Sequence, residues 1–301
     1  MKFAVALTGL MLSQGFIPKH HAEPQRRGGD HGPVQARPAS SASPRLCVRP
    51  AQEPVDRVEI NGAFDRFTTD EIGNVYTLQG DEVALYDAKG KRLLRNSLKT
   101  FGSITAIDAF SSLKPMIFSG RQGMLALLDN TLAIQGDPID LNRNGYPQVT
   151  LACMSVQNSF WFFDERLLQL TRVDNQLRPL AATGRLDQLL GFSPRPVYMQ
   201  EFDSWLYVCD PEQGVLVFDI FGGYAKTIPI IGAATLEVRD GHILYLKDGV
   251  LHSYDMKTFA ISMPVTWLAT SKEKGLRDAR IERGLLYALY PDRIVIAPAT
   301  E

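Results

Sequence analysis

The stretch Glu82-Val-Ala-Leu-Tyr-Asp-Ala-Lys-Gly-Lys-Arg-Leu-Leu94 reads as a strand, a turn at Lys89-Gly90 and a second strand that restarts at Arg92. Apolar runs that end in aspartate recur along the chain. Their last residues are Asp87, Asp129, Asp174, Asp219 and Asp255, with gaps of 42, 45, 45 and 36. A second series places an aromatic residue 10 to 12 residues upstream of each aspartate, and it consists of Tyr76, Phe118, Phe162, Tyr207, Tyr245 and, beyond the last aspartate, Tyr287.

The distance in sequence between the aromatic residue and the aspartate stays nearly constant, so the two series mark one repeated unit. A period of about 40 to 45 residues with about four strands per unit is typical of a propeller blade. The pattern therefore predicts an all-β fold. It predicts no chemistry, because propellers carry many unrelated functions.

Six units can be traced. Five span about 64–99, 104–141, 149–182, 196–230 and 234–265, and the sixth runs from 277 to 297. In the second unit the fourth strand is expected at Leu132 to Gln135. The sixth has three strands, whereas the segment 55–61 is an extra strand before the first unit. A strand from the N-terminal side that completes the last blade would close the ring and remove an exposed sheet edge. We therefore predict a six-bladed β-propeller of four-stranded blades, closed by about residues 55–61.

Three segments are expected. Residues 1–22 resemble a signal peptide, with Lys2 before a short apolar run from Phe3 to Leu12. Residues 23–54 are rich in proline, arginine and serine and are expected to be disordered, because they lack the apolar residues needed to offset the entropy of ordering. Residues 55–301 are expected to form the single propeller domain.

Charge and cysteine content exclude several classes of protein. Residues 1–50 carry seven basic and two acidic residues, and the remainder carries 25 and 31, so the propeller region is mildly acidic. Such a domain is a poor nucleic-acid binder. The three cysteines, Cys47, Cys153 and Cys209, have no metal-binding spacing. The last two lie in apolar strands and are expected to be buried, with a bridge between them left open.

Candidate chemical motifs are weak. His242 and His252 flank a two-residue turn, which places them on opposite faces of a hairpin, so they cannot share a metal ion. The run Asp140-Leu-Asn-Arg-Asn-Gly145 has the spacing of a calcium loop, but Leu151 stands where a bidentate glutamate belongs. We therefore assign no catalytic, cofactor-binding or metal-binding residue and expect no cofactor.

Acidic residues early in the predicted inner strands are few, namely Asp65 and Asp278, which argues against an axial metal site and against a cluster of titratable residues at the axis. The recurring aspartates are expected to stabilise the turn that follows them by accepting hydrogen bonds from their own backbone. The longest connections, 136–148 and 183–195, are the candidate contact surface, and the second of them contains one predicted helical turn.

The repeated pattern Gly73-Asn-Val-Tyr-Thr-Leu…Val83-Ala-Leu-Tyr-Asp-Ala-Lys-Gly resembles the broad NHL/YncE/quinoprotein-like group of propellers over residues 55–301. In detail it looks like exported propellers of Gram-negative bacteria. The three tryptophans, Trp161, Trp205 and Trp267, lack the periodic placement of quinoprotein dehydrogenases, so quinone binding is not implied.

The sequence thus favours a non-enzymatic propeller of the cell envelope, periplasmic or associated with the outer membrane. It would act as a protein-protein interaction scaffold or binding module and have a protein partner, no nucleic-acid partner and no transmembrane span. Peripheral association with a membrane complex stays open. The alternatives are a hydrolase or lyase with a site at the central channel, and a carbohydrate-binding propeller, for which Phe192 and Trp267 are the only indications.

Overall fold

A computed structural model of the chain describes residues 57–109, 114–265 and 275–299, which belong to the compact unit Gln52–Glu301. The expected signal peptide (1–22), the expected disordered leader (23–54) and the first residues of the predicted strand 55–61 lie outside the described residues. Within the described residues, no helix has the length and apolar composition needed to cross a membrane.

The described residues form six four-stranded antiparallel sheets. The first three contain β2 (Arg66–Thr69), β3 (Val75–Gln79), β4 (Glu82–Tyr86) and β5 (Arg92–Ser97); β6 (Ala106–Asp108), β7 (Met116–Ser119), β8 (Met124–Leu127) and β9 (Ile139–Asp140); and β10 (Val149–Ser155), β11 (Ser159–Asp164), β12 (Gln169–Val173) and β13 (Pro179–Ala182). The last three contain β14 (Tyr198–Phe202), β15 (Trp205–Asp210), β16 (Gly214–Asp219) and β17 (Tyr224–Ile228); β18 (Leu236–Arg239), β19 (His242–Lys247), β20 (Val250–Asp255) and β21 (Ile261–Ser262); and β22 (Asp278–Glu282), β23 (Leu285–Leu289), β24 (Arg293–Pro298) and β1 (Val58–Asn61).

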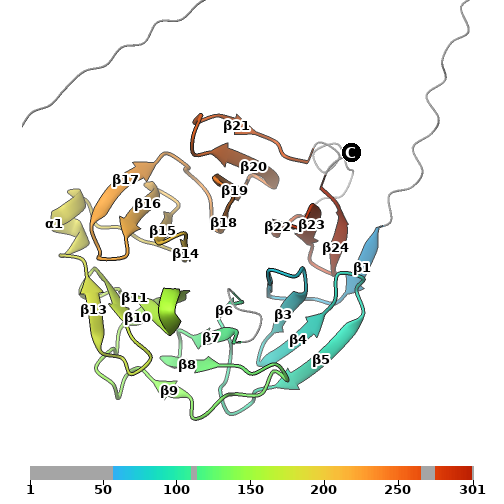
Figure 1. The fold of residues 1–301 in the computed structure, drawn as a ribbon, viewed down its shortest axis with the longest axis horizontal. Coiled ribbons are helices and arrows are strands. Elements are labelled where there is room, and N and C mark those ends of the chain that lie inside the picture. Colours follow the sequence, from blue (N-terminus) through green and yellow to red (C-terminus); the bar gives the residue numbers. More distant parts are fainter. Residues whose placement is uncertain (1–56, 110–113, 266–274, 300–301) are drawn as a thin grey trace, which may run out of the picture. The chain divides into compact units, whose positions relative to one another are not determined.

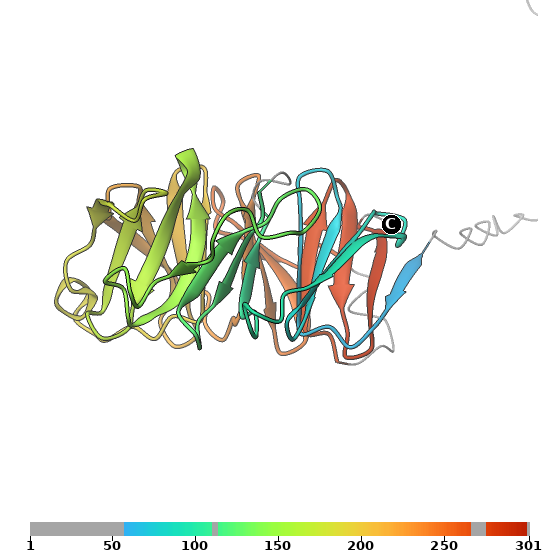
Figure 2. The same cartoon turned by 90° about the horizontal axis from the view of Figure 1, so that it is seen from below.

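These sheets are the blades of a six-bladed propeller, as predicted. They stand around a common centre, with the first strand of each blade innermost (Figure 1). Seen from the side, the strands run between the two faces of the ring (Figure 2). The turns within each blade and the connections between blades therefore lie at these two faces.

Apolar side chains on both faces of each blade hold the ring together. In β11, Phe160 and Phe162 pack toward blade two, whereas Trp161 and Phe163 pack toward blade four. Six clusters of buried apolar residues occur among the described residues, one between each pair of neighbouring blades. This arrangement explains why the middle strands read as continuous apolar runs, because neither face of a blade is exposed to water.

The recurring aspartates stabilise the turn after the third strand of a blade, as predicted. Oδ1 of Asp87 accepts hydrogen bonds from the backbone N–H of Lys89 and Lys91, both at 2.9 Å. The carboxylates of the other four make the same type of local backbone contact, and they are Asp129, Asp174, Asp219 and Asp255. Each aspartate thus has a structural role that accounts for its recurrence.

The ring is closed by β1, as predicted. It pairs with β24 in antiparallel register, with Ile60 opposite Ile294 and Val58 opposite Ile296. The turn at Gly90 in blade one packs against this strand. At Gly90, whose φ is +75°, an added Cβ would lie 2.6 Å from Cγ1 of Val58, so a larger residue would not fit without movement.

Two further predictions have outcomes. The fourth strand of blade two was expected at residues 132–135, and this is wrong: Ile134 forms only an isolated bridge with Leu128, and the fourth strand is β9 at Ile139–Asp140. The sequence there contains the turn-forming Asp129 and a non-glycine residue at positive φ, Leu132, which shift the return strand. The predicted helical turn in 183–195 is confirmed as α1 (Leu186–Leu190).

We predict that Ile60→Ala lowers the free energy of unfolding by about 2 to 5 kcal/mol, because it leaves a cavity in a buried cluster. Ile60 is 4% exposed and packs in the cluster between blades six and one. Glu59→Gln on the same strand affects only surface ion pairs and should change stability by about 0 to 1 kcal/mol. Urea unfolding measures both, and equal effects would contradict a buried closing strand.

A second prediction concerns acid. Hydrogen bonds within their turns lower the pKa of three of the recurring aspartates. The donors are Thr131 and Ala133 for Asp129, and Arg178 and Gln176 for Asp174. For Asp255 they are Thr258 and Lys257. A lowered folded-state pKa stabilises the fold above the unfolded-state pKa of about 3.9, and this contribution is lost as the pH falls through the lower value.

The variant D129N/D174N/D255N keeps an acceptor oxygen at each turn but cannot titrate. We therefore expect its urea midpoint to fall less steeply than that of the wild type between pH 5 and pH 2.5. Parallel curves would show that these carboxylates do not couple folding to pH.

Candidate functional site

The inner strands of all six blades surround an axial cavity of about 430 Å³. The lining extends from Arg66 to Glu71 along β2 and from Thr235 to Asp240 along β18. The cavity therefore runs along the inner strands β2 and β18 over most of their length. Its volume falls in the range of sites for small molecules.

The lining is rich in charged side chains. Its carboxylates are Glu71, Asp108, Glu201, Glu237, Asp240 and Asp278, and its guanidiniums are Arg66, Arg239 and Arg280. Six carboxylates against three guanidiniums make the formal charge of the lining −3. The expectation that the axis lacks a cluster of titratable residues is therefore wrong.

Sequence reasoning missed this cluster because no fixed spacing connects its members. Asp108 and Glu237 lie within or at the end of their strands, and Glu201 lies one residue before the end of β14. In the sequence they appear only as single acidic residues inside or beside short apolar runs. Only the ring brings these separate strands to one axis.

Several polar side chains of the inner strands bind the backbone of a neighbouring blade. Asp108 of blade two accepts a hydrogen bond from Met154 N of blade three at 2.9 Å. Glu237 of blade five accepts one from Ile281 N of blade six at 3.0 Å. Innermost strands have one edge without a strand partner, so these side chains satisfy backbone donors that would otherwise be unpaired.

Glu201 makes the most extensive of these contacts. Its carboxylate accepts hydrogen bonds from the hydroxyl of Ser155, from Val156 N at 3.0 Å and from Nε1 of Trp161 at 2.6 Å. The side chain is 5% exposed. A buried carboxylate with three donors from the adjacent blade acts as a clamp between blades three and four.

Arg280 lies at the centre of a second group. Its guanidinium interacts with the hydroxyl of Tyr198 and with the charges of Asp278 and Glu237, and it stands over the ring of Phe67 at 5.8 Å from the centroid. The side chain is 8% exposed. Its Nε has no hydrogen-bond partner among the described residues.

Burial changes the ionisation of this group. Burial raises the pKa of Asp278 and of Glu237, although Arg280 opposes the rise in both. Burial also raises the pKa of Tyr198, although Arg280 opposes this rise too. Burial disfavours the charged form of Arg280, but Tyr198 and the two carboxylates outweigh it, so the pKa of Arg280 is raised.

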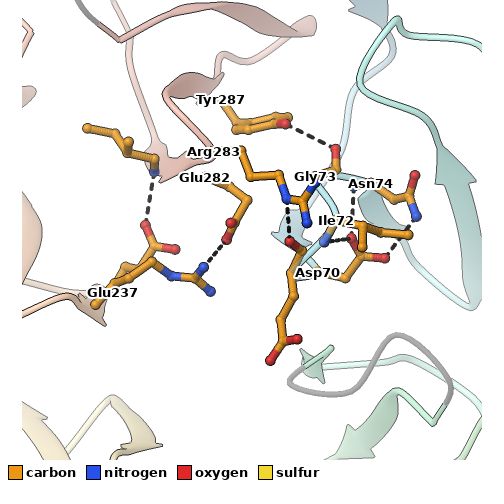
Figure 3. Close-up of polar contacts among 11 residues, drawn as sticks. Asp70, Ile72, Gly73, Asn74, Glu237, Glu282, Arg283 and Tyr287 are labelled. Atoms are coloured by element: carbon orange, nitrogen blue, oxygen red, sulfur yellow. Dashed lines mark hydrogen bonds and ion pairs between the residues drawn. The ribbon is translucent and has the colours of Figure 1, made fainter.

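Blades six and one meet at one end of the inner strands (Figure 3). The hydroxyl of Tyr287 donates to the carbonyl oxygen of Gly73 at 3.0 Å, and Nε of Arg283 donates to the carbonyl oxygen of Glu71 at 2.7 Å. Asp70 holds the same turn, because its carboxylate accepts hydrogen bonds from the backbone N–H groups of Ile72 and Asn74. These contacts fix one rim of the ring.

The two histidines and Cys209 lie away from the cavity, whereas Cys153 is part of its lining. His242 is opposite Asp255 and His252 is opposite Tyr245, which confirms that the two histidines point to opposite faces of their hairpin. Neither lines the cavity. Cys153 and Cys209 are free and buried, and burial raises the pKa of Cys209 to about 12.

The run Asp140–Gly145, which has the spacing of a calcium loop, forms a polar loop whose side chains pair with groups of the same loop. Asp140 pairs with Arg143 at 3.1 Å, and the amide of Asn144 donates to the carbonyl oxygen of Asp140 at 2.7 Å. Within the described part of the chain, no group of three or more histidine, cysteine or acidic side chains is arranged to hold a metal ion. Phe192 packs partly buried against the cluster between blades three and four, and Trp267 lies outside the described residues.

Comparison with known proteins reveals similarity in fold. No protein-family model matches the chain, and no curated protein matches it in sequence. A catalytically inactive virginiamycin B lyase from Staphylococcus aureus with quinupristin is 12% identical, with a TM-score of 0.55, and the match covers 79% of this chain and 81% of that one.

Two other solved structures are similar to the same degree. The WD40 domain of Neurospora crassa Pan2 is 8% identical, with a TM-score of 0.56 over 80% of this chain and 90% of that one. An extracellular domain from B. thetaiotaomicron is 12% identical, with a TM-score of 0.51 over 78% of this chain and 34% of that one. Such low identities establish a common propeller architecture alone.

We predict that Glu201→Ala lowers the free energy of unfolding by about 3 kcal/mol or more, because three donors of blade three lose their acceptor. Glu201→Gln keeps one acceptor oxygen and should be less destabilising. The near-ultraviolet circular dichroism of Trp161 should change with Glu201→Ala, because the indole N–H loses its partner. An unchanged spectrum and stability would contradict the clamp.

Proposed function

We propose that the chain is an exported, non-enzymatic binding module whose ligand occupies the axial cavity. One observation carries this proposal: four of the cavity's carboxylates already accept structural hydrogen bonds. They are Asp108, Glu201, Glu237 and Asp278, the last of which accepts from Thr235 at 3.0 Å and from Ala279 N at 2.9 Å. Groups engaged in this way hold a cavity open and shape it.

The rigidity of the ring supports binding. The lining residues sit on inner strands that are fixed by apolar clusters on both sides and by hydrogen bonds between blades. A cavity that exists before the ligand arrives loses little conformational entropy when the ligand binds. We assign no catalytic, cofactor-binding or metal-binding role to any residue.

The proposed location is the cell envelope, either the periplasm or the outer-membrane surface. It rests on the signal-like segment 1–22, followed by the leader 23–54 and the propeller domain 55–301. The extracellular propeller from B. thetaiotaomicron supports it by analogy of fold. We further propose that the chain is related to the NHL/YncE/quinoprotein-like propellers.

A protein partner in the envelope would dock on the connections 136–148 and 183–195. α1 lies in the second of these and is held to the blades by Leu186 and Leu190, whereas Leu189 is 47% exposed. A fixed loop that presents an apolar side chain is suited to contact a partner.

A lyase or hydrolase acting at the cavity is the second candidate. The observation that favours it is the pair of carboxylates with raised pKa, Asp278 and Glu237, beside Arg280 and Tyr198, because perturbed acids in a cavity are typical of acid–base catalysis. The lyase among the similar structures adds the same suggestion.

The binding proposal is tested with Val197→Trp. Val197 lines the cavity and is 43% exposed, so the indole should obstruct the cavity without disturbing a packed cluster. We expect native mass spectrometry of the protein from the envelope fraction to show a bound small molecule with the wild type and not with this variant. Ile231→Trp is the matched control, because Ile231 is also 43% exposed and lies outside the lining.

Absence of a ligand from the wild type, or equal retention by Val197→Trp, would contradict binding in the cavity. A protein that co-purifies with both variants would place the contact on the loops. Turnover of the bound molecule would favour the lyase or hydrolase.

A further inference from the structure

We propose that a second copy of the chain pairs with the first through the outer edge of blade five. This edge consists of residues 259–263, which contain β21, and the two copies would add to each other as antiparallel strands. β21 is the outermost strand of its blade, so the edge lies on the rim of the ring (Figure 1). The inference is independent of the proposed function, which concerns the axial cavity.

Ring closure leaves this edge without a cover. In blades one and two, the turn between the third and fourth strands packs against the outer strand of the preceding blade. Gly90 in the turn of blade one lies against Val58 of β1. The carbonyl oxygen of Leu132 in the turn of blade two accepts a hydrogen bond from Nδ2 of Asn96 on β5 at 2.9 Å. No such turn joins the third and fourth strands of blade six, because β24 and β1 come from opposite ends of the domain, so the outer strand of blade five has no turn of this kind beside it.

The exposure of the edge agrees with this missing turn. On β1 and β17 the residues that face the next blade, Ile60 and Ile228, are buried. On blade five every residue from 257 to 263 is exposed, on both faces of the strand. The exposed fractions of Phe259, Ile261 and Met263 are 66%, 59% and 53%. Three exposed apolar side chains on a free sheet edge are typical of a site of strand pairing.

The charge pattern of the outer strands favours a second copy as the occupant. A two-fold axis brings each edge against the same edge of the other copy, so a charged edge repels itself. The other five outer strands carry charged residues or a proline, and these are Glu59 in β1, Arg92 and Arg95 in β5, Asp140 in β9, Pro179 in β13 and Lys226 in β17. The edge 259–263 has neither. Within the described ranges it is the one outer edge that can pair with itself without like charges or a lost backbone donor.

The backbone of β21 has the register that pairing needs. Asp255 N donates to the carbonyl oxygen of Ala260 at 2.9 Å, and Ser253 lies opposite Ser262 two positions further along. Hydrogen-bonded pairs alternate with non-hydrogen-bonded pairs along an antiparallel ladder. Ala260 and Ser262 therefore direct their backbone groups toward β20, whereas Ile261 directs its N–H and C=O away from it.

A two-fold axis at Ile261 gives the paired edges a defined register. The N–H and C=O of Ile261 would bond to those of Ile261 in the second copy, and Phe259 of one copy would lie opposite Met263 of the other. The interface would thus combine backbone hydrogen bonds with apolar contacts. The edge supplies both halves of this interface, and no second kind of surface is required.

Sedimentation velocity on the full chain tests the pairing. We expect the wild type to change from monomer to dimer as its concentration rises from about 1 to about 200 µM, because mass action favours the dimer. Amide hydrogen exchange in the peptide that contains 259–263 should become slower over the same range, because the N–H of Ile261 gains an acceptor.

Charge variants assign the contact to the edge. Ile261→Lys places two positive charges across the two-fold axis and should weaken dimerisation about tenfold or more, and Ile261→Glu should do the same. A mixture of the two variants should associate again, because the facing charges are then opposite. Leu93→Lys is the matched control, since Leu93 is also an exposed apolar residue of an outer strand, and it should leave dimerisation unchanged. Thermal unfolding verifies that each variant is folded.

The pairing would be overturned by a chain that stays monomeric over the whole range, or by a dimer that Ile261→Lys leaves intact. A dimer that both charge variants disrupt but that their mixture does not restore would contradict the two-fold register. Equal weakening by Leu93→Lys would show nonspecific association. If the chain stays monomeric and 259–263 is protected only when another protein is bound, the edge belongs to that partner and the second copy is wrong as its occupant. None of these results bears on the cavity, whose ligand is tested with Val197→Trp.

Discussion

The pairing of β1 with β24 is the interaction on which the rest of the fold depends. β1 is followed in the chain by blade one, but its hydrogen bonds belong to blade six, with Ile60 opposite Ile294. This pairing joins the two ends of the domain in one sheet (Figure 1). Without this pairing, blade six would expose an unpaired edge at β24. The apolar cluster between blades six and one would also lose the side chains that β1 contributes, Ile60 and Val58.

Closure has a consequence at the axis. Six innermost strands converge there, and each has one edge with no strand beside it. Side chains such as Asp108, Glu201 and Glu237 reach the backbone of a neighbouring blade and supply the missing acceptors. The polar character of the cavity therefore follows from the architecture, because the backbone donors of the inner edges need partners in a region partly shielded from water.

The polar side chains of the inner strands differ in how far their hydrogen bonds are satisfied. Glu201 is fully engaged as a clamp, whereas Arg280 keeps one donor without a partner at the cavity wall. A ring that satisfies most of its buried polar groups internally is rigid. This division of roles links the stability of the propeller to the chemistry of its cavity.

The sequence by itself determined the repeat, the number of blades, the closing strand and the role of the recurring aspartates, because all of these depend on local patterns. The period of the aspartates and aromatics reports one supersecondary unit, and the turn chemistry of Asp87 involves only the next four residues. The fourth strand of blade two was misplaced, since the loop after Asp129 contains a second apolar run, Leu132 to Ile134, that pairs only through one bridge.

Only the tertiary structure decided the site. Asp108, Glu201, Glu237 and Asp278 are far apart in the chain, and none belongs to a motif with a fixed spacing. They become neighbours because six separate inner strands share one axis, and that depends on the rotation from blade to blade. Periodicity records which strands exist and in what order, but the side chains that meet at the centre are set by the closed ring.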